Sequence, residues 1–145
     1  MPTDHDISTS RVLNAPPDAV FAAFRDPVRL ARWWGPEGFR NTFDEFDFRP
    51  GGNWRFVMHG PNGADYRNHS VFAEIGAERI VFDHVSAPKF RMTLTFDTEP
   101  GGRTRLGWTQ TFGSRDERDR IAAFAGAANE QNLDRLEAEL ARRDS

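Results

Sequence analysis

Residues 90–117 read FRMTLTFDTEPGGRTRLGWTQTFGSRDE, and this segment contains the pattern of two strands, a turn and the start of a helix. From Phe90 to Phe96, apolar side chains occupy every second position, which is typical of a strand with one buried face and one face in water. The Pro-Gly-Gly sequence at 100–102 predicts a turn, and residues 106–112 then alternate in the same way. The segment therefore predicts an antiparallel hairpin with one apolar face.

The residues after this hairpin predict a long amphipathic helix. Ser114, with Glu117 three positions later, forms a capping box, a pattern typical of a helix N-terminus. A helix of about 28 residues from this point would be about 42 Å long, and Arg142 and Arg143 would complement the negative end of its dipole. One face of the helix is apolar with a polar amide at its centre, and it consists of Ala122, Ala125, Asn129, Leu133, Leu136 and Leu140.

Upstream of the hairpin, the chain predicts one strand followed by two short helices. The strand covers residues 7–13, where β-branched residues are frequent. The pairs Pro16-Pro17 and Asp26-Pro27 are typical of helix starts, because proline suits the first turn and aspartate caps it. The second short helix stops at Gly35-Pro36.

The middle of the chain reads as strands separated by turns. Apolar residues recur at every second position, and their phase slips between Phe43 and Phe46, which indicates a β-bulge. Turn signals follow at Gly51-Gly52, Pro61-Asn62-Gly63 and Gly76-Ala77. No helices alternate with these strands, so we expect an α+β fold with an antiparallel sheet of six or seven strands. The sheet should curl over the long helix, in a single domain that spans residues 1–145.

Composition excludes several classes of function. The chain has no cysteine, which excludes disulfides, thiolate metal ligands and a cysteine nucleophile. Its net charge is −3 and its basic residues are scattered among acidic ones, so nucleic acid is not an expected partner. The N-terminus lacks a signal-peptide pattern and no apolar run is long enough to span a membrane. We therefore expect a cytoplasmic protein without a membrane partner, either a monomer or a weak homodimer.

Several segments of the chain together resemble a known superfamily. They are Ala15-Pro16-Pro17 with Val20-Phe21, Asp26-Pro27, Trp33-Trp34-Gly35-Pro36, Gly51-Gly52-Asn53-Trp54, Met58-His59-Gly60-Pro61-Asn62-Gly63 and Leu133-Asp134-Arg135-Leu136. In this order they resemble the START-like, birch-pollen-allergen-like helix-grip superfamily (SRPBCC). Within it they are most similar to the branch named after the activator of heat-shock protein 90 ATPase. The resemblance runs from about Ile7 to Leu140.

This resemblance implies a cavity between the long helix and the concave face of the sheet. Many relatives carry Gly-Trp before the Leu-Asp-x-Leu segment of the last helix, where this chain has Ala128-Asn129. If that tryptophan fills the pocket in the relatives, its replacement leaves more room and a polar group. Relatives include lipid and hormone binders, polyketide cyclases, ring-hydroxylase subunits and a co-chaperone domain, so the fold by itself does not define the chemistry.

Large side chains are the first candidates for the wall of such a cavity. The chain has 13 Phe and 4 Trp but a single Tyr, which is more aromatic bulk than one small core often uses. Each candidate could equally belong to ordinary core packing, and only their number favours a pocket. The candidates are Trp33, Trp34, Trp54, Phe56, Met58, Met92, Phe96, Trp108 and, on the long helix, the small Ala125.

Three polar residues are candidates for contacting a ligand. His84 follows apolar residues on one strand face, so its imidazole could act as an acid or base, unless the ring reaches solvent at the strand end. The hydroxyl of Tyr66 could orient a ligand carbonyl or lie in water at the rim. Asn129 contacts a ligand, joins a network with Gln110 or the backbone, or reaches solvent on a rotated helix. Arg11, in contrast, is expected to point into solvent.

No complete catalytic motif is present in the sequence. The histidines lack metal-ligand spacing, and no nucleophile elbow, phosphate loop or dinucleotide fingerprint occurs, so we expect no metal and no cofactor. These observations favour a non-enzymatic binder of a small apolar molecule, such as a lipid or an aromatic compound. One alternative is a cavity enzyme of cyclase or dehydratase type, in which His84, Tyr66 and Asn129 polarise a carbonyl. The other is a module that binds a chaperone or another protein.

Overall fold

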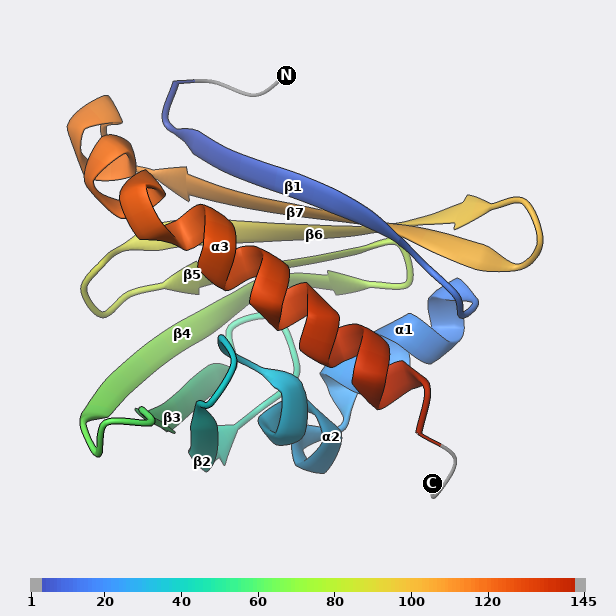
Figure 1. The fold of residues 1–145 in the computed structure, drawn as a ribbon, viewed down its shortest axis with the longest axis horizontal. Coiled ribbons are helices and arrows are strands. Elements are labelled where there is room, and N and C mark those ends of the chain that lie inside the picture. Colours follow the sequence, from blue (N-terminus) through green and yellow to red (C-terminus); the bar gives the residue numbers. More distant parts are fainter. Residues whose placement is uncertain (1–3, 143–145) are drawn as a thin grey trace.

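The computed structural model describes residues 4–142, in which a seven-stranded antiparallel sheet packs against three helices (Figure 1). The elements follow one another as β1 (Asp6–Leu13), α1 (Pro17–Arg25), α2 (Pro27–Trp33), β2 (Arg40–Phe46), β3 (Asn53–His59), β4 (Asp65–Gly76), β5 (Arg79–His84), β6 (Phe90–Glu99), β7 (Arg103–Phe112) and α3 (Arg115–Leu140). The strand order is β1-β7-β6-β5-β4-β3-β2, so β1 and β2 are the two edges. The predicted α+β helix-grip fold is confirmed, with the long helix lying across the sheet.

The predicted helix starts are confirmed in atomic detail. At α2, the Asp26 carboxylate accepts a hydrogen bond from the Val28 amide at 3.0 Å. At α3, the Ser114 hydroxyl accepts one from the Glu117 amide at 3.2 Å. The helix ends at Leu140, after 26 residues, and is thus slightly shorter than predicted. Arg142 lies beyond this end, and Arg143 lies outside the described residues.

Two β-bulges and a glycine turn shape the sheet. The register between β2 and β3 shifts between Phe43 and Glu45, which confirms the bulge predicted from the phase slip. A second shift, between Phe72 and Glu74 in β4, had no clear sequence signal. Bulges increase local twist and bend, which allows the sheet to curve around α3. The predicted turn between β6 and β7 contains Gly101 and Gly102, both at positive φ, where residues with a side chain are strained.

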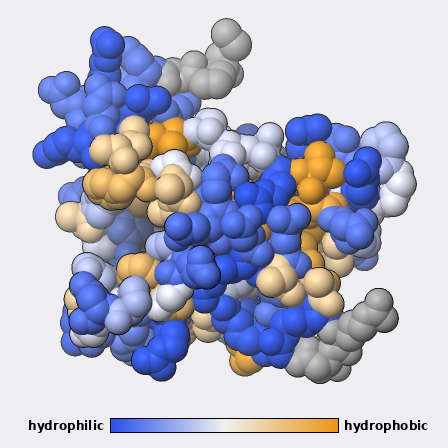
Figure 2. Space-filling view, in the orientation of Figure 1, coloured by the Kyte–Doolittle hydropathy of each residue, from blue (hydrophilic) through white to orange (hydrophobic). Residues whose placement is uncertain are grey.

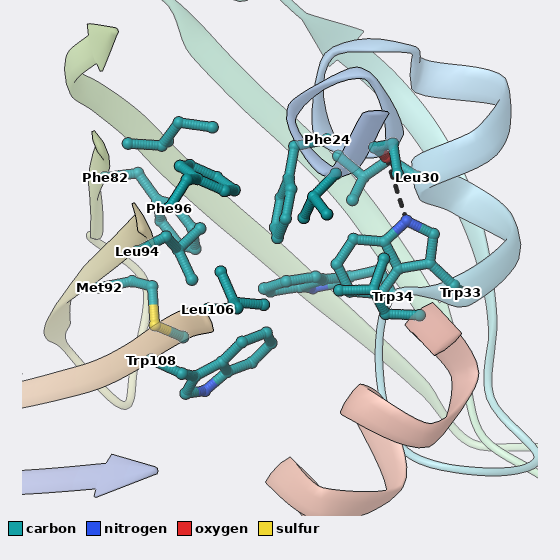
Figure 3. Close-up of a cluster of buried hydrophobic side chains, with 14 of the residues drawn as sticks. Phe24, Leu30, Trp33, Trp34, Phe82, Met92, Leu94, Phe96, Leu106 and Trp108 are labelled. Carbon is teal, nitrogen blue, oxygen red and sulfur yellow. Dashed lines mark hydrogen bonds between the residues drawn. The ribbon is translucent and has the colours of Figure 1, made fainter. Parts of the chain in front are cut away.

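The core fills the space between the sheet, α1, α2 and the second half of α3 (Figure 3). Phe24, Leu30 and Trp33 pack from the two short helices against Leu94 and Leu106 of the sheet, and all are buried. The indole nitrogen of Trp33 donates a hydrogen bond to the Ala23 carbonyl oxygen at 3.1 Å, so this buried donor has a partner. Each large side chain contributes roughly 1.5–3 kcal/mol by burial, so the packing of α1 and α2 on the sheet is a main source of stability.

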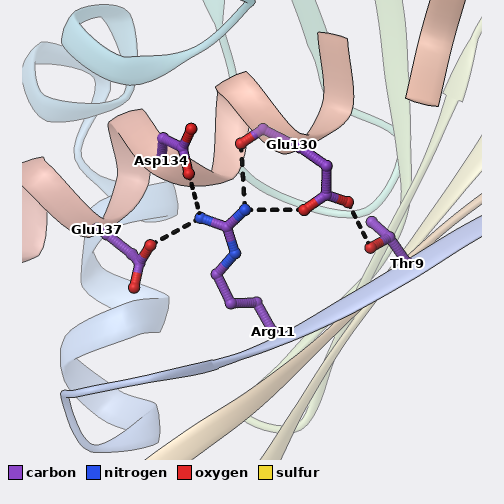
Figure 4. A network of polar contacts seen from close by, with 5 residues as sticks. All are labelled: Thr9, Arg11, Glu130, Asp134 and Glu137. Carbon is purple, nitrogen blue, oxygen red and sulfur yellow. Dashed lines mark hydrogen bonds and ion pairs between the residues drawn. The ribbon is translucent and has the colours of Figure 1, made fainter. Parts of the chain in front are cut away.

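Polar contacts attach α3 to the rest of the fold. Arg11 of β1 contacts the carboxylates of Glu130, Asp134 and Glu137 at 2.7–2.8 Å (Figure 4). The expectation that Arg11 points into solvent was therefore wrong. Arg11 pairs in register with the buried Leu106, so it lies on the concave face, next to three acidic residues on successive turns of α3. No helix of the described residues is long and apolar enough to cross a membrane.

Candidate functional site

A cavity of about 200 Å³ lies between α3 and the concave face of strands β3 to β7. Its position follows from the chain: the solid core occupies the α1 and α2 end, and α3 crosses the other half of the sheet with small or polar residues facing inward. Ala128 and Asn129 line the cavity from α3, and Pro36 and Pro88 line it from loops. In Figure 2, α3 begins with a hydrophilic surface, apolar colours follow further along its first half, and most of the outer surface of its second half is hydrophilic.

The structure brings seven of the twelve residues proposed from the sequence to this cavity. Trp34 and Trp108 lie nearly parallel, with ring centroids 5.5 Å apart, and give the wall an aromatic surface. Phe56 and Met58 of β3 and Met92 of β6 add apolar side chains on the same face of the sheet. The seven residues are Trp34, Phe56, Met58, His84, Met92, Trp108 and Asn129.

The other five proposed residues lie elsewhere. Trp33, Trp54 and Phe96 are buried in the core, and Ala125 is buried on α3 beside the cavity but outside its lining. Tyr66 shares the concave face with Met58, but its side chain is 48% exposed and its ring packs near Phe39, 6.1 Å between centroids. Tyr66 is therefore at the rim, as its alternative interpretation expected.

His84 reaches the cavity from the end of β5 and is only 7% exposed. Its Nδ1 lies 2.8 Å from the Pro88 carbonyl oxygen, and because that oxygen can only accept, Nδ1 carries a proton. Its Nε2 lies 2.7 Å from the Asn68 side-chain oxygen and 3.4 Å from the Ser86 hydroxyl. Burial lowers the pKa of His84, and the nearby His69 also lowers it, whereas the backbone hydrogen bonds act in the opposite direction. The ring is thus neutral at pH 7.

The amide of Asn129 has a protein partner. Its Nδ2 donates to the Gln110 side-chain oxygen at 2.9 Å, so the network with Gln110 that the sequence left open is present. Three residues further on, Asn132 is buried and was missed by the sequence reasoning. It donates to the Trp33 carbonyl at 3.0 Å and accepts from the Gly35 amide at 3.2 Å, which joins α3 to the loop after α2. Its spacing from Asn129 on one helix face was the available signal.

Two buried polar groups beside the cavity have no hydrogen-bond partner. Ser70 is completely buried and lines the cavity from β4, and its Oγ has no partner among the described residues. The indole Nε1 of Trp108, which also lines the cavity, is likewise buried without a hydrogen-bond partner among the described residues. An unmet hydrogen bond of this kind costs about 1–3 kcal/mol. Neither group could be identified from the sequence, since Ser70 follows the ordinary alternation of its strand.

Three larger hollows lie on the surface of the described part of the chain, and the two largest have a mainly apolar lining. One, of about 760 Å³, is formed by Phe112, Ile121 and Phe124 with neighbouring residues, and Phe124 is 64% exposed. The other, of about 620 Å³, lies between α1 and the β4–β5 turn and includes Phe21 and Phe96. Among residues 4–142, no group of three or more histidine or acidic side chains is arranged to hold a metal ion.

A curved antiparallel sheet that packs against a long C-terminal helix, with a pocket between them, is the architecture of the helix-grip class of START-like domains. A family model described as "Activator of Hsp90 ATPase homolog 1-like protein" matches residues 14–141, and the chain belongs to this family. The resemblance found in the sequence is thus confirmed.

Solved structures agree with this assignment. A protein from Arthrobacter aurescens has a TM-score of 0.88 at 24% identity, with 98% of this chain and 89% of that chain covered. A protein from Chromobacterium violaceum has a TM-score of 0.81 at 26% identity, with 97% and 100% covered. The AHSA1 protein from Silicibacter pomeroyi has a TM-score of 0.76 at 23% identity, with 94% and 97% covered. These similarities show the fold, and no curated protein matches the chain.

Proposed function

We propose that this chain binds a small, largely apolar molecule in the cavity beneath α3. The observation that carries the proposal is the cavity itself, about 200 Å³ beside two buried and unpartnered polar groups. An apolar cavity of about 150 Å³ can hold benzene, so the space here suits a guest of about one ring. Family membership is consistent with binding a ligand in this position.

The composition of the wall supports binding rather than solid packing. Trp34, Phe56 and Phe82 present aromatic surface, and Met58 and Met92 add flexible side chains that adapt to the shape of a guest. The burial of a ligand against such a wall removes apolar surface of both partners from water. A few polar groups in a mostly apolar pocket are the usual composition of a small-molecule site.

The proposal is tested by thermal unfolding in the presence of lipids, sterols and small aromatic compounds. A ligand that binds the folded state raises its stability, by about 2.7 kcal/mol at a hundredfold excess over Kd. We expect at least one compound to stabilise the wild-type protein and to lose its effect in Asn129→Trp, because the indole would occupy the cavity. Ala127→Trp places the same ring on the exposed side of α3 and should retain binding. Stabilisation below about 1 kcal/mol for every saturating compound would contradict the proposal.

The two alternatives have different support. The enzymatic alternative required His84, Tyr66 and Asn129 at one site, and Tyr66 does not line the cavity that the other two share. Docking of a chaperone or another protein is the second candidate, and the exposed Phe124 beside its apolar hollow is the observation that favours it.

A further inference from the structure

The surface hollow of about 620 Å³ beside α1 lies apart from the internal cavity, and the two share no lining residue. Three segments form this hollow: one side of α1, the β4–β5 turn and the end of β6. Its volume is within the range of small-molecule sites, about 300–1,000 Å³. A guest of this hollow would thus be independent of the guest proposed for the cavity.

The floor of the hollow is apolar and aromatic. Phe96 of β6 is buried there, and Phe21 and Ile75 are partly buried. The rings of Phe21 and Phe96 meet edge to face, with their centroids 6.0 Å apart. The Arg25 guanidinium lies over the Phe21 ring, 5.8 Å from its centroid. Because an aromatic ring attracts a cation to its face, the floor suits a guest that is both apolar and positively charged.

The rim of the hollow carries three exposed carboxylates, those of Asp18, Glu78 and Asp97. Within residues 4–142, none of the three takes part in an ion pair or a side-chain hydrogen bond. Arg25 is the one basic residue of the lining, so three negative charges against one positive charge leave a formal charge of −2. Exposed charges of one sign around a hollow attract a guest of the opposite sign.

The arginines of the neighbouring strands are directed at other carboxylates. Arg79, at the start of β5, pairs with Glu74 at 3.5 Å. Arg105 lies opposite Asp97 in the register of β6 and β7, but its Nε contacts Glu99 at 3.2 Å. The hollow therefore combines an apolar, aromatic floor with a negative rim that no ion pair compensates.

We propose that this hollow is a second binding site, which takes a small organic amine with an apolar body. The body lies on Phe21, Ile75 and Phe96, and the ammonium group faces the carboxylates of the rim. An uncharged guest of the same shape gains the apolar contact alone. A guest with a carboxylate is repelled by the three like charges.

Three probes with the same phenylbutyl body separate charge from shape: 4-phenylbutylamine, 4-phenylbutanol and 4-phenylbutyrate. Titration of the ¹⁵N-labelled full chain, followed by amide chemical shifts, gives the affinity of each. At low salt the amine should bind about tenfold more tightly than the alcohol, since several exposed ion pairs each add a small contribution. The butyrate should bind most weakly. At about 1 M salt, where the screening length is near 3 Å, the advantage of the amine should fall to a few-fold.

The same spectra locate the bound amine. Its addition should move the amide resonances of Gly76, Ala77 and Glu78, which line the hollow. The indole N–H resonances of Trp34 and Trp108 report on the internal cavity, so any binding there is recognised separately.

Variants of the rim test the role of charge. Asp97→Asn removes one carboxylate and should weaken amine binding about two- to threefold without affecting the alcohol. Asp116→Asn makes the same change in net charge at an exposed position of α3 outside the hollow, and should alter neither. Arg25→Gln removes the competing cation and should strengthen amine binding a few-fold.

The proposal is wrong if the amine does not bind at the hollow, binds no more tightly than the alcohol at low salt, or is insensitive to Asp97→Asn. Tighter binding of the butyrate, lost in Arg25→Gln, would assign an anion to the hollow and would equally overturn it. The function proposed for the internal cavity would stand in each of these cases.

Discussion

At the scale of single residues, two opposing effects act on the protonation of the His84 ring. Its ring nitrogens face the Pro88 carbonyl oxygen and the Asn68 side-chain oxygen, an arrangement that only the doubly protonated ring satisfies with two donated hydrogen bonds. Its burial beside an apolar cavity, with Phe90 stacked on it at 4.8 Å between centroids, opposes the charge. The lowered pKa of His84 shows that burial is the larger effect. The Ser86 hydroxyl can then donate to the unprotonated Nε2.

This balance predicts a pH dependence of stability. Because the folded-state pKa of His84 lies below the unfolded value, the unfolded chain takes up the proton first as the pH falls. The contribution of His84 is therefore complete above about pH 6.5, the ordinary histidine pKa, and is lost as the pH decreases below it. The free energy of unfolding of His84→Gln, measured by urea titration from pH 7.5 to 5, should fall less steeply than that of the wild type. His5→Gln, away from the cavity, is the matched control, and identical slopes for wild type and His84→Gln would contradict the prediction.

The residues also show what the sequence could predict about the site. The period of two in the strands correctly put Phe56, Met58, Met92 and Trp108 on one face, because alternation determines which face a side chain takes. It could not tell which part of that face is covered by helices and which part remains hollow. Trp54 and Phe96 share the face but lie in the packed half, a distinction that depends on how α1 and α2 fold back over the sheet.

At the scale of elements, Glu139 joins the last helix to the second short helix. It is 4% exposed, and both carboxylate oxygens accept hydrogen bonds, from Arg29 at 3.0 Å and from Arg32 at 2.9 and 3.0 Å. Burial alone would raise the pKa of Glu139, but the hydrogen bonds from Arg32 and Arg29 outweigh it and the pKa is lowered. The sequence analysis missed this residue because a glutamate on a helix is usually solvated.

Replacement of Glu139 should weaken the attachment of α2 to α3. Glu139→Gln keeps the shape of the side chain but removes the charge, and we expect a loss of about 1–2 kcal/mol, since the two arginines remain partly in water. Glu45→Gln removes an exposed pair with Arg55 and should cost less than about 1 kcal/mol. Urea unfolding at pH 7 measures both. At acid pH the carboxylate of the wild type becomes protonated, so the difference between wild type and Glu139→Gln should shrink, and a constant difference would contradict the proposed role.

The elements themselves were largely predictable. The caps at Asp26 and Ser114, the glycine turns and the bulge after Phe43 depend on neighbouring residues, and all were found in the sequence. The attachments of α3 could not be found in this way. Arg11 and Glu130 are 119 positions apart in the sequence, and Arg32 and Glu139 are 107 apart. A pattern of neighbouring residues therefore cannot predict either contact.

At the scale of the whole molecule, the fold is divided into a solid half and a hollow half. The second half of α3 is held by the aromatic core on one side and by Arg11 and Glu139 on the others. Near the middle of the helix, Ala128, Asn129 and Asn132 line the cavity, and the segment from the Ser114 cap to Ala127 contributes no residue to its lining. Under the proposed function, this division would let the molecule hold a guest without losing the position of the helix, because most of the contacts that fix α3 lie outside the pocket.

The network around Arg11 gives a test of this division (Figure 4). Arg11 joins the edge strand β1 to three carboxylates of α3, and hydrogen bonds from Thr9 and Arg11 lower the pKa of Glu130. Arg11→Met keeps the apolar stem but leaves the three carboxylates on successive turns to repel one another. We expect a loss of about 2–3 kcal/mol in the free energy of unfolding at low salt, measured by urea titration.

The same variant distinguishes attachment of the helix from a general effect of charge. Salt screens the repulsion between the uncompensated carboxylates, so the difference between wild type and Arg11→Met should decrease from low ionic strength to about 1 M, where the screening length is near 3 Å. Arg67→Met, on the exposed part of β4, should stay within about 0.5 kcal/mol of the wild type at any salt concentration. If Arg11→Met loses no more stability than Arg67→Met, the Arg11 network does not hold α3, and the helix is held by the aromatic core and by its other contacts, such as those of Glu139.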